Sequence, residues 1–363
     1  PTAHISIRND PVSLSRTTHR GCQSGRHAAS GDRMEAGHPA AIVLQFARQA
    51  PRYVRVDNYS FRVSYRANTQ FSRIPLNLIG RFPSQGYLDA RMAATELEES
   101  IMDYKTIILE KRDGVAYITL NRPDEANALD LATATELHEA ALDCNQDAGV
   151  RAILITANGK MFCGGGDLKF FHGSDGSIES LLMQVTLQFH RAISLFNRMD
   201  APVVMAINGT AAGGGFSFAI SGDIIFAAES AKFVSAYTAA GLSPDGSSTY
   251  LLPRYIGLRR AKELMLTNRV LSADEARGYD LIDYVVPDAE LFAAADKQAR
   301  AFASGPTKAY GAVKRLLDGS FNESLETQME LESRSISNLA AGTDGSEGIG
   351  AFVEKRKPAF KGE

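Results

Sequence analysis

Two glycine triplets constrain the fold of this chain more than any other feature of its sequence. The first lies in GKMFCGGGDLKFF, residues 159–171, and the second in INGTAAGGGFSFAISGD, residues 207–223. Each triplet follows a predicted strand and leads towards a predicted helix. Glycine lets the backbone approach a ligand closely, and the start of a helix leaves N–H groups unpaired. Two such corners that face each other can direct two N–H groups at one oxygen, which defines an oxyanion hole.

Neither triplet has the spacing of a nucleotide-binding loop. Neither run reads GxGxxG with a following ribose-binding acid, and neither reads GxxxxGK[ST]. A single glycine triplet also serves as a packing or capping device, so that alternative stays open for each one. The occurrence of two triplets in matching contexts is more specific than either alone.

Strand and helix patterns alternate around the triplets. The runs TIILEK and VAYITLN predict a hairpin that turns at Arg112-Asp113-Gly114. Further strands are predicted for RAILITA, PVVMAING and DIIFAAE, and helices for DLATATELHEAALDCNQD and ESLLMQVTLQFHRAISLFNRM. This alternation predicts a layered α/β core domain over residues 102–290. Predicted strands then stop, and four helical patterns indicate a C-terminal helical region over residues 291–363.

Residues 1–101 differ in composition from the rest of the chain. They contain thirteen Arg, no Lys and eight acids, whereas residues 102–363 carry 26 basic and 34 acidic residues. We expect this segment to be a disordered or non-native N-terminal extension, with Met92 or Met102 as the natural start of the protein. A targeting segment and a nucleic-acid-binding arm are the alternatives.

Composition argues against several classes of function. A net charge of −3 provides no overall basic field for nucleic acid. Cys22, Cys144 and Cys163 form no CxxC pair and no His/Cys cluster, so we expect neither a metal site nor a disulfide framework. No apolar run reaches the length of a membrane span. We therefore expect a cytoplasmic protein without membrane or nucleic-acid partners.

Four motifs in order resemble the crotonase, or enoyl-CoA hydratase/isomerase, superfamily. They are FCGGGDL, INGTAAGGGFSFAISGDIIFAAESAKF, GLSPDGSSTYLLPR and LSADEARGYDLIDYVVPD, and IGAFVEKRKPAF resembles the family's ending. The resemblance covers about residues 104–358. It implies a ββα superhelical core, a helical C-terminal trimerisation region, and a homotrimer or a dimer of trimers. It also implies an acyl-CoA thioester as substrate, with coenzyme A as part of that substrate and no metal or other cofactor.

The resemblance also implies roles for individual residues. The oxyanion-hole donors are the backbone N–H groups of Gly166 and Gly214. Family members that hydrate enoyl-CoA carry two glutamates, and the matching positions here are Ser217 and Tyr237. Asp245 stands where several isomerase-type members carry a single acid.

A single carboxylate suits a double-bond shift. Asp245 can remove a proton from C2 of a 3-enoyl-CoA and return it at C4, because both carbons lie on one face of a planar dienolate. We therefore predict an acyl-CoA isomerase. The alternatives are an aroyl-CoA dehalogenase or thioester hydrolase that uses Asp245 as nucleophile or base, an enoyl-CoA hydratase, and a non-catalytic RNA-binding protein of this fold. Asp245 is also a candidate N-cap for a helix beginning near Gly246.

Several further residues are expected to contact the substrate. The candidates are Cys163, Gly164, Asp167, Leu168, Ser217, Tyr237 and Lys355. Each has a simpler alternative: packing for Cys163, Ser217 and Tyr237, a helix cap for Asp167, and a solvated basic cluster for Lys355. His172 is more simply explained as structural or solvent-exposed.

Overall fold

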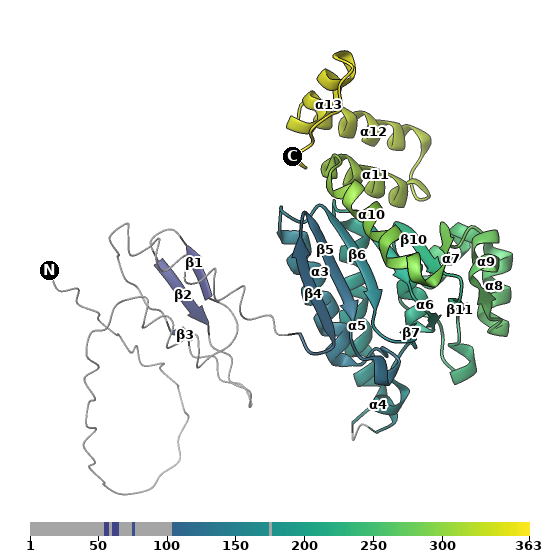
Figure 1. Ribbon diagram of the computed structural model, residues 1–363. Helices are drawn as coiled ribbons and strands as arrows, with labels where there is room; N and C mark the ends of the chain where they lie inside the picture. The colour runs from purple at the N-terminus through teal and green to yellow at the C-terminus, as the bar shows by residue number, and fades with distance from the viewer. Residues whose placement is uncertain (1–53, 58–59, 65–74, 77–103, 174–175) are drawn as a thin grey trace, which may run out of the picture. The chain divides into compact units, whose positions relative to one another are not determined.

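The structure is a computed structural model that describes residues 54–57, 60–64, 75–76, 104–173 and 176–363 (Figure 1). The chain divides into two units, residues 1–103 and residues 104–363. In the first unit, β1 (Val54–Asp57), β2 (Ser60–Ser64) and β3 (Pro75–Leu76) form a small antiparallel sheet. No strand was expected there. The remainder of the predicted extension, residues 1–101, lies outside the described residues.

The predicted hairpin opens the larger unit. β4 (Ile107–Arg112) and β5 (Val115–Leu120) pair in antiparallel register, with Arg112 opposite Val115. The two turn residues, Asp113 and Gly114, have φ values of 53° and 78°. Positive φ at both central positions is typical of the type I′ turn that fits the twist of a two-residue hairpin. The hairpin prediction is therefore confirmed at this turn.

The other predicted strands extend this hairpin into a six-stranded sheet. β5 is followed in space by three parallel neighbours, β6 (Ala152–Ala157), β8 (Val203–Ile207) and β10 (Ile224–Ala228), and then by the edge strand β13 (Tyr284–Val286). All five residues of β8 are buried. Strands covered on both faces read as continuous apolar runs, which explains the sequence pattern.

A second, four-stranded sheet brings the glycine triplets together. Its strands are β7 (Met161–Cys163), β9 (Thr210–Ala212), β11 (Lys232–Val234) and β12 (Leu271–Ser272). β7 and β9 are parallel neighbours, with Cys163 opposite Ala211. Because one triplet follows each of these strands, the parallel pairing places both triplets at the same edge of the sheet.

Helices cover the sheets and carry an aromatic core. α3 (Leu131–Gln146) packs along α5 (Ile178–Arg198), and α6 (Gly214–Ala219) packs against β9 and β7. Phe218 of α6 has ring centroids of Phe162, Phe189 and Phe196 within 5.9–6.2 Å. These rings fix α5 and α6 to the end of β7. The remaining helices before residue 290 are α4 (Leu168–His172), α7 (Ser248–Ile256), α8 (Leu258–Thr267) and α9 (Ala273–Gly278).

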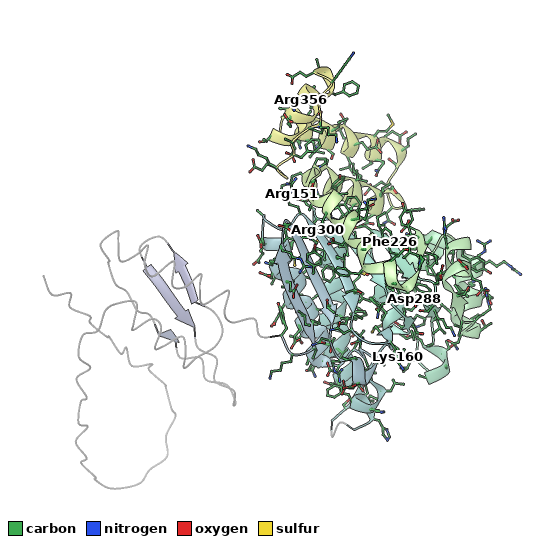
Figure 2. All side chains as sticks on the ribbon, in the orientation of Figure 1. Arg151, Lys160, Phe226, Asp288, Arg300 and Arg356 are labelled. Atoms are coloured by element: carbon green, nitrogen blue, oxygen red, sulfur yellow. The ribbon has the colours of Figure 1, made fainter. Side chains whose placement is uncertain are left out.

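Four helices follow the sheets, as predicted (Figure 1). They are α10 (Leu291–Ala303), α11 (Thr307–Ser320), α12 (Leu325–Ala340) and α13 (Thr343–Val353). α10 packs on the six-stranded sheet, whereas α12 buries none of its side chains. Arg151, beside β6, donates to the carbonyl oxygens of Gly305 and Phe360 at 2.6 and 3.1 Å (Figure 2). This arginine ties the end of the chain to the core.

Within the described part of the chain, no helix combines the length and apolar character needed to cross a bilayer.

Candidate functional site

The two glycine corners lie directly against each other. A Cβ placed on Gly165 would lie 2.8 Å from the carbonyl oxygen of Ala212 and 3.2 Å from the amide nitrogen of Gly214. Gly165 also has a φ of 95°, in the left-handed region that favours glycine. Among the hydrogen bonds of the described residues, neither the Gly166 amide nor the Gly214 amide is a donor. Both N–H groups are thus available to a ligand.

Leu129 holds the first corner on both sides of Gly166. Its N–H donates to the Gly165 carbonyl at 2.7 Å, and its carbonyl accepts from the Asp167 N–H at 3.0 Å. The flanking peptide groups are therefore fixed to a neighbouring segment. The Gly166 N–H lies between them and is left unpaired.

Arg122 clamps this corner by charge. Its guanidinium reaches Asp167 at 3.1 Å and Asp130 at 3.2 Å, and it donates to the Ala128 carbonyl at 2.7 Å. Asp167 caps α4 by accepting from the Phe170 N–H, as the helix-cap alternative predicted, and Asp130 caps α3 in the same way. One arginine therefore fixes two helix starts beside Gly166. Sequence analysis did not single out Arg122.

The second corner is held by packing. Gly213 has a φ of 53°, and all six residues of α6, beginning with Gly214, are buried. A Cβ on Gly215 would lie 2.2 Å from the carbonyl oxygen of Cys163. No side chain larger than hydrogen fits there, so the first turn of α6 lies directly against the end of β7.

Asp245 is held between two side chains. The Tyr237 hydroxyl donates to Oδ1 at 2.6 Å, and Oδ2 lies 3.4 Å from Nε2 of His190. The Tyr237 hydroxyl also lies 2.8 Å from Oγ of Ser217, which is fully buried. Burial, and then the negative charge of Asp245, raise the pKa of Tyr237, so its hydroxyl stays protonated as a donor. Asp245, Tyr237 and Ser217 therefore form one hydrogen-bonded group.

The alternative role of Asp245 as a helix cap is wrong. α7 begins at Ser248, its N-cap residue is Ser247, and no side chain caps it. The carbonyl oxygen of Asp245 accepts from the N–H and the hydroxyl of Ser248 at 3.3 and 2.9 Å. The backbone of Asp245 thus anchors the loop to α7, which leaves the carboxylate free for other contacts.

His190 is the site residue that sequence analysis missed. It lies on α5, and its Nε2 accepts a hydrogen bond of 3.1 Å from the Gly246 N–H while facing Asp245. Its side chain is 49% exposed, so the ring connects the carboxylate to the surface. The only sign in the sequence was its position on a long amphipathic helix, 55 residues before Asp245.

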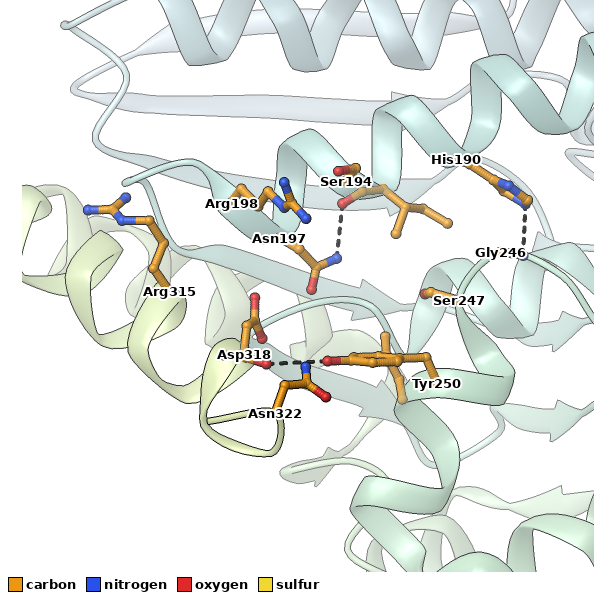
Figure 3. A pocket seen from close by; sticks show the side chains of 13 residues that line it. His190, Ser194, Asn197, Arg198, Gly246, Ser247, Tyr250, Arg315, Asp318 and Asn322 are labelled. Atoms are coloured by element: carbon orange, nitrogen blue, oxygen red, sulfur yellow. Dashed lines mark hydrogen bonds between the residues drawn. The ribbon is translucent and has the colours of Figure 1, made fainter. Parts of the chain in front are cut away.

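His190 and Gly246 also form one wall of an open pocket of about 660 Å³ (Figure 3). The pocket lies between α5, the start of α7 and the end of α11. Figure 3 shows His190 at one end of the pocket and Arg315 at the other. Most of the remaining lining is polar: Ser194, Asn197, Arg198, Ser247, Tyr250, Asp318 and Asn322.

The other predicted contact residues are only partly gathered here. Cys163 is fully buried, and this burial raises the pKa of its thiol to about 12, so the side chain stays a neutral packing group. The Gly164 N–H is used by the Ala126 carbonyl at 2.8 Å. Leu168 is 54% exposed at the start of α4. Lys355 comes just after α13, which lies beyond α11 from the sheets (Figure 1).

Within the residues the structure describes, no three His, Cys, Asp or Glu side chains form a group able to hold a metal ion. The chemistry available at this site is therefore that of two backbone amides, a carboxylate, a phenol and an imidazole.

Comparison with known proteins agrees with this geometry. The sequence profile of the family described as Enoyl-CoA hydratase/isomerase matches residues 110–363. This chain belongs to the enoyl-CoA hydratase/isomerase family. A "Probable enoyl-CoA hydratase" of Rhodobacter capsulatus is 37% identical over 263 residues, which cover 72% of this chain and 100% of that protein. The "1,2-epoxyphenylacetyl-CoA isomerase" of Escherichia coli is 37% identical over 259 residues, covering 71% and 98%.

Solved structures show the same relationship. The crystal structure of an enoyl-CoA hydratase from Bacillus anthracis superposes with a TM-score of 0.67 at 34% identity, covering 71% of this chain and 100% of that one. The predicted crotonase-type α/β fold is therefore confirmed. The family's name covers both hydratases and isomerases. Of the two relatives above, one is named a hydratase and the other an isomerase.

Proposed function

We propose that this protein is an enoyl-CoA isomerase that moves a double bond from the 3,4 to the 2,3 position of an acyl-CoA, or performs the equivalent shift in a ring-type substrate. One observation carries the proposal. Asp245 is the carboxylate at the site, and Ser217 and Tyr237, which stand at the two glutamate positions of hydratases, hydrogen-bond to each other and lead to it. A site with one acid suits proton shuttling along a substrate.

The oxyanion corner supplies the first part of the mechanism. The thioester oxygen would accept hydrogen bonds from the Gly166 and Gly214 amides as it becomes an enolate oxygen. Fixed donors directed at developing charge need no reorganisation during the reaction, and each is typically worth about 10²–10³ in rate. The thioester itself makes the neighbouring C–H acidic once its oxygen is stabilised, so the proposal includes no metal or redox cofactor.

Asp245 would move the proton. Its carboxylate takes a proton from C2, the electrons delocalise into a dienolate, and the carboxylic acid then protonates C4. Because Tyr237 donates to Oδ1, that oxygen is engaged, and Oδ2 is the oxygen able to act as base. Negative charge therefore develops on the thioester oxygen, between the two amides. It disappears when C4 is protonated.

The same geometry gives a reason why simple hydration is disfavoured. Adding water to a double bond needs one group to activate the water and another to protonate carbon. Both glutamates of a hydratase are replaced here, one by the Ser217 hydroxyl, which is 0% exposed, and the other by the Tyr237 phenol. A hydroxyl that is hydrogen-bonded to Tyr237 is not a base at neutral pH.

The proposal is tested with a panel of 3-enoyl-, 2-enoyl-, dienoyl- and 4-chlorobenzoyl-CoA, followed by ultraviolet absorption and mass spectrometry. Isomerisation changes the absorption without changing the mass, hydration adds the mass of water, and dehalogenation releases halide. We expect Asp245→Asn to lose about 10²–10⁴ in kcat, the usual range for a general acid–base residue, while CoA-ester binding persists. Asp274→Asn, at an exposed aspartate of α9, is the matched control.

His190 favours a second candidate, an aroyl-CoA dehalogenase or thioester hydrolase. An ester formed on Oδ2 of Asp245 would lie beside an imidazole that faces an open pocket and could activate water. Halide release from 4-chlorobenzoyl-CoA, or free coenzyme A from a saturated thioester, would favour this candidate over the isomerase.

A homotrimer or a dimer of trimers remains part of the proposal. The exposed apolar side chains of α12, among them Leu325, Met329 and Ile336, support it because more than half of each side chain is left open to solvent. Sedimentation velocity on the purified chain measures this directly, and a monomer at micromolar concentration would contradict it.

A further inference from the structure

We infer that the open pocket beside Asp245 selects acyl-CoA esters whose acyl chain ends in a carboxylate. The inference rests on the proposed function for the place of the acyl chain. It adds the class of acyl group, which the isomerase proposal leaves open. Arg198 is assigned as the residue that binds the terminal carboxylate.

The proposed mechanism fixes the direction in which the acyl chain runs. The thioester oxygen lies between the Gly166 and Gly214 amides, and C2 to C4 lie at Oδ2 of Asp245. His190 faces that same oxygen at 3.4 Å and also lines the pocket, together with Gly246, the residue after Asp245. The carbons beyond C4 are therefore expected to continue past His190 into the pocket.

The middle of the pocket suits a methylene chain. Ile193 on α5 and Leu251 on α7 are both buried, and they line the pocket together with Tyr250. The Tyr250 hydroxyl donates to the backbone carbonyl of Asp318 at 3.2 Å, which joins α7 to α11 along one side of the pocket (Figure 3). Moving methylene groups out of water against these side chains is favourable.

The far end of the pocket carries an arginine that is free to bind an anion. Arg198 and Arg315 line this end with Asp318, so two cations stand beside one anion (Figure 3). Arg315 is paired with Asp200, which is outside the lining. Arg198 is exposed, and its side chain forms neither an ion pair nor a hydrogen bond with any residue that the structure describes.

The helix that forms this end of the pocket is firmly attached to the core. Lys314 of α11 donates from Nζ to the carbonyl oxygens of Phe196 and Ala201 at 2.9 and 3.2 Å. It pairs with Asp223 at 2.7 Å, and only 9% of its side chain is exposed. These contacts hold α11 against the end of α5, next to Arg198. The site for the carboxylate is therefore formed before the substrate binds, which lowers the cost of binding.

The spacing along α5 sets the length of chain that can reach the arginine. Arg198 follows His190 by eight residues, which is about 12 Å along the helix axis. Long helical side chains lean towards the start of their helix, so the guanidinium of Arg198 extends back towards His190. A guanidinium can bind a carboxylate through two parallel N–H···O bonds. A chain of sufficient length thus places its terminal carboxylate on Arg198, whereas a short acyl group does not reach it.

The test measures binding instead of turnover, so its result does not depend on isomerisation. Saturated acyl-CoA esters, which have no double bond to move, are titrated by calorimetry in pairs of equal chain length, one ending in a methyl group and one in a carboxylate. Among the longer pairs we expect wild-type protein to bind the carboxyl-ended ester about tenfold more tightly, the low end of the range for a hydrogen bond to a charged group. The shortest pairs should not show this preference.

Two substitutions of opposite sign test the charges. Arg198→Met should abolish the preference for the carboxyl-ended ester. Asp318→Asn should increase it about threefold, because it removes the anion that repels the ligand. Arg191→Met, at an exposed arginine of the same helix outside the pocket lining, is the matched control and should leave the preference unchanged. Circular dichroism verifies folding, and Arg198→Gln is the second variant if the methionine fails this check.

The outcomes separate the two proposals. Equal affinity for both esters at every chain length, or an equal preference in Arg198→Met and Arg191→Met, overturns the carboxylate subsite and leaves the isomerase standing. Tighter binding of the carboxyl-ended esters that depends on Arg198 supports the subsite. If no enoyl-CoA is isomerised in the separate activity panel, that binding result still stands and only the proposed reaction is overturned.

Discussion

The two glycine corners each leave one backbone N–H unpaired, but different interactions hold them in place. The first corner, at Gly166, is held by an arginine that joins two helix-capping aspartates, and all three side chains are partly buried. The second, at Gly214, is held by a short helix whose six residues are all buried. One corner therefore depends on charge and hydrogen bonding, and the other on the absence of side-chain volume.

This difference predicts how each corner responds to change. Packing against backbone has no flexible partner that can move aside, so a single added methyl group is costly. Loss of one contact should weaken the ion pairs of Arg122 only in part, because the charged groups are partly solvated and several contacts hold the segment. We therefore expect substitutions at the second corner to act mainly on the free energy of unfolding. Substitutions at the first corner should also lower the catalytic rate.

The largest expected effect is that of Gly215→Ala. The new Cβ would stand 2.2 Å from the Cys163 carbonyl oxygen, so β7 and α6 must separate. We expect a loss of about 3 kcal/mol or more in the free energy of unfolding, measured by urea denaturation. Gly278→Ala, where the added Cβ meets no atom within 4 Å, is the control. Equal stability of the two variants would contradict the packing account of this corner.

The next effect is that of Arg122→Met. Asp130 and Asp167 would lose their cation while remaining 15% and 13% exposed, which should cost about 2 kcal/mol after allowance for solvent. Because Gly166 directly precedes Asp167, we also expect kcat to fall about tenfold with a smaller change in KM, consistent with loss of an oxyanion donor's alignment. Steady-state kinetics below the unfolding temperature measure this. An unchanged kcat would show that Leu129 alone positions Gly166.

Ser217→Ala should have a smaller effect. It removes the 2.8 Å partner of the Tyr237 hydroxyl while keeping the volume of the buried helix nearly constant. The expected cost is about 1 kcal/mol, the usual net value of one hydrogen bond. Tyr237 would still donate to Asp245, so activity should persist. Comparison of the chemical denaturation midpoints of wild type and variant tests this, and loss of activity in a folded variant would assign Ser217 a more direct part.

The last effect concerns pH. Burial raises the pKa of the Cys163 thiol from 9.0 to about 12, so the folded protein keeps a proton that the unfolded chain loses above about pH 9. The stability associated with this thiol is present below pH 9 and declines between pH 9 and 12. Cys163→Ala should therefore show a shallower alkaline loss of stability than wild type. Parallel loss in both proteins between about pH 8 and about pH 10.5 would contradict this assignment.

Much of the fold could be predicted because its signals are local. The turn at Asp113-Gly114 and the apolar run of β8 are each contained within a few residues. The three strands near residues 54–76 were not predicted, although VRVD and SFRVS alternate apolar and polar residues, because each strand is only two to five residues long. Such short strands depend on pairing with partners that local sequence does not reveal.

The residues of the site also divide into those that the local sequence predicts and those that it does not. Gly166, Gly214 and Asp245 stood in motifs, whereas Arg122 and His190 acquire their partners only through packing. The His190 ring meets Asp245 because α5 lies against the loop before α7, and Arg122 meets Asp167 across 45 residues of chain. No spacing rule connects such residues.

The tight contact between Gly246 and Ser217 bears on how activities interconvert in evolution and engineering. A Cβ on Gly246 would already lie 2.8 Å from the Ser217 Cβ, and Ser217 has no exposed surface. Installing a glutamate at Ser217 would force a second carboxylate into a space without room or counter-charge. Conversion of this protein into a hydratase with two acids would therefore require the loop around Asp245 to change first. The single substitution Ser217→Glu would not be accommodated.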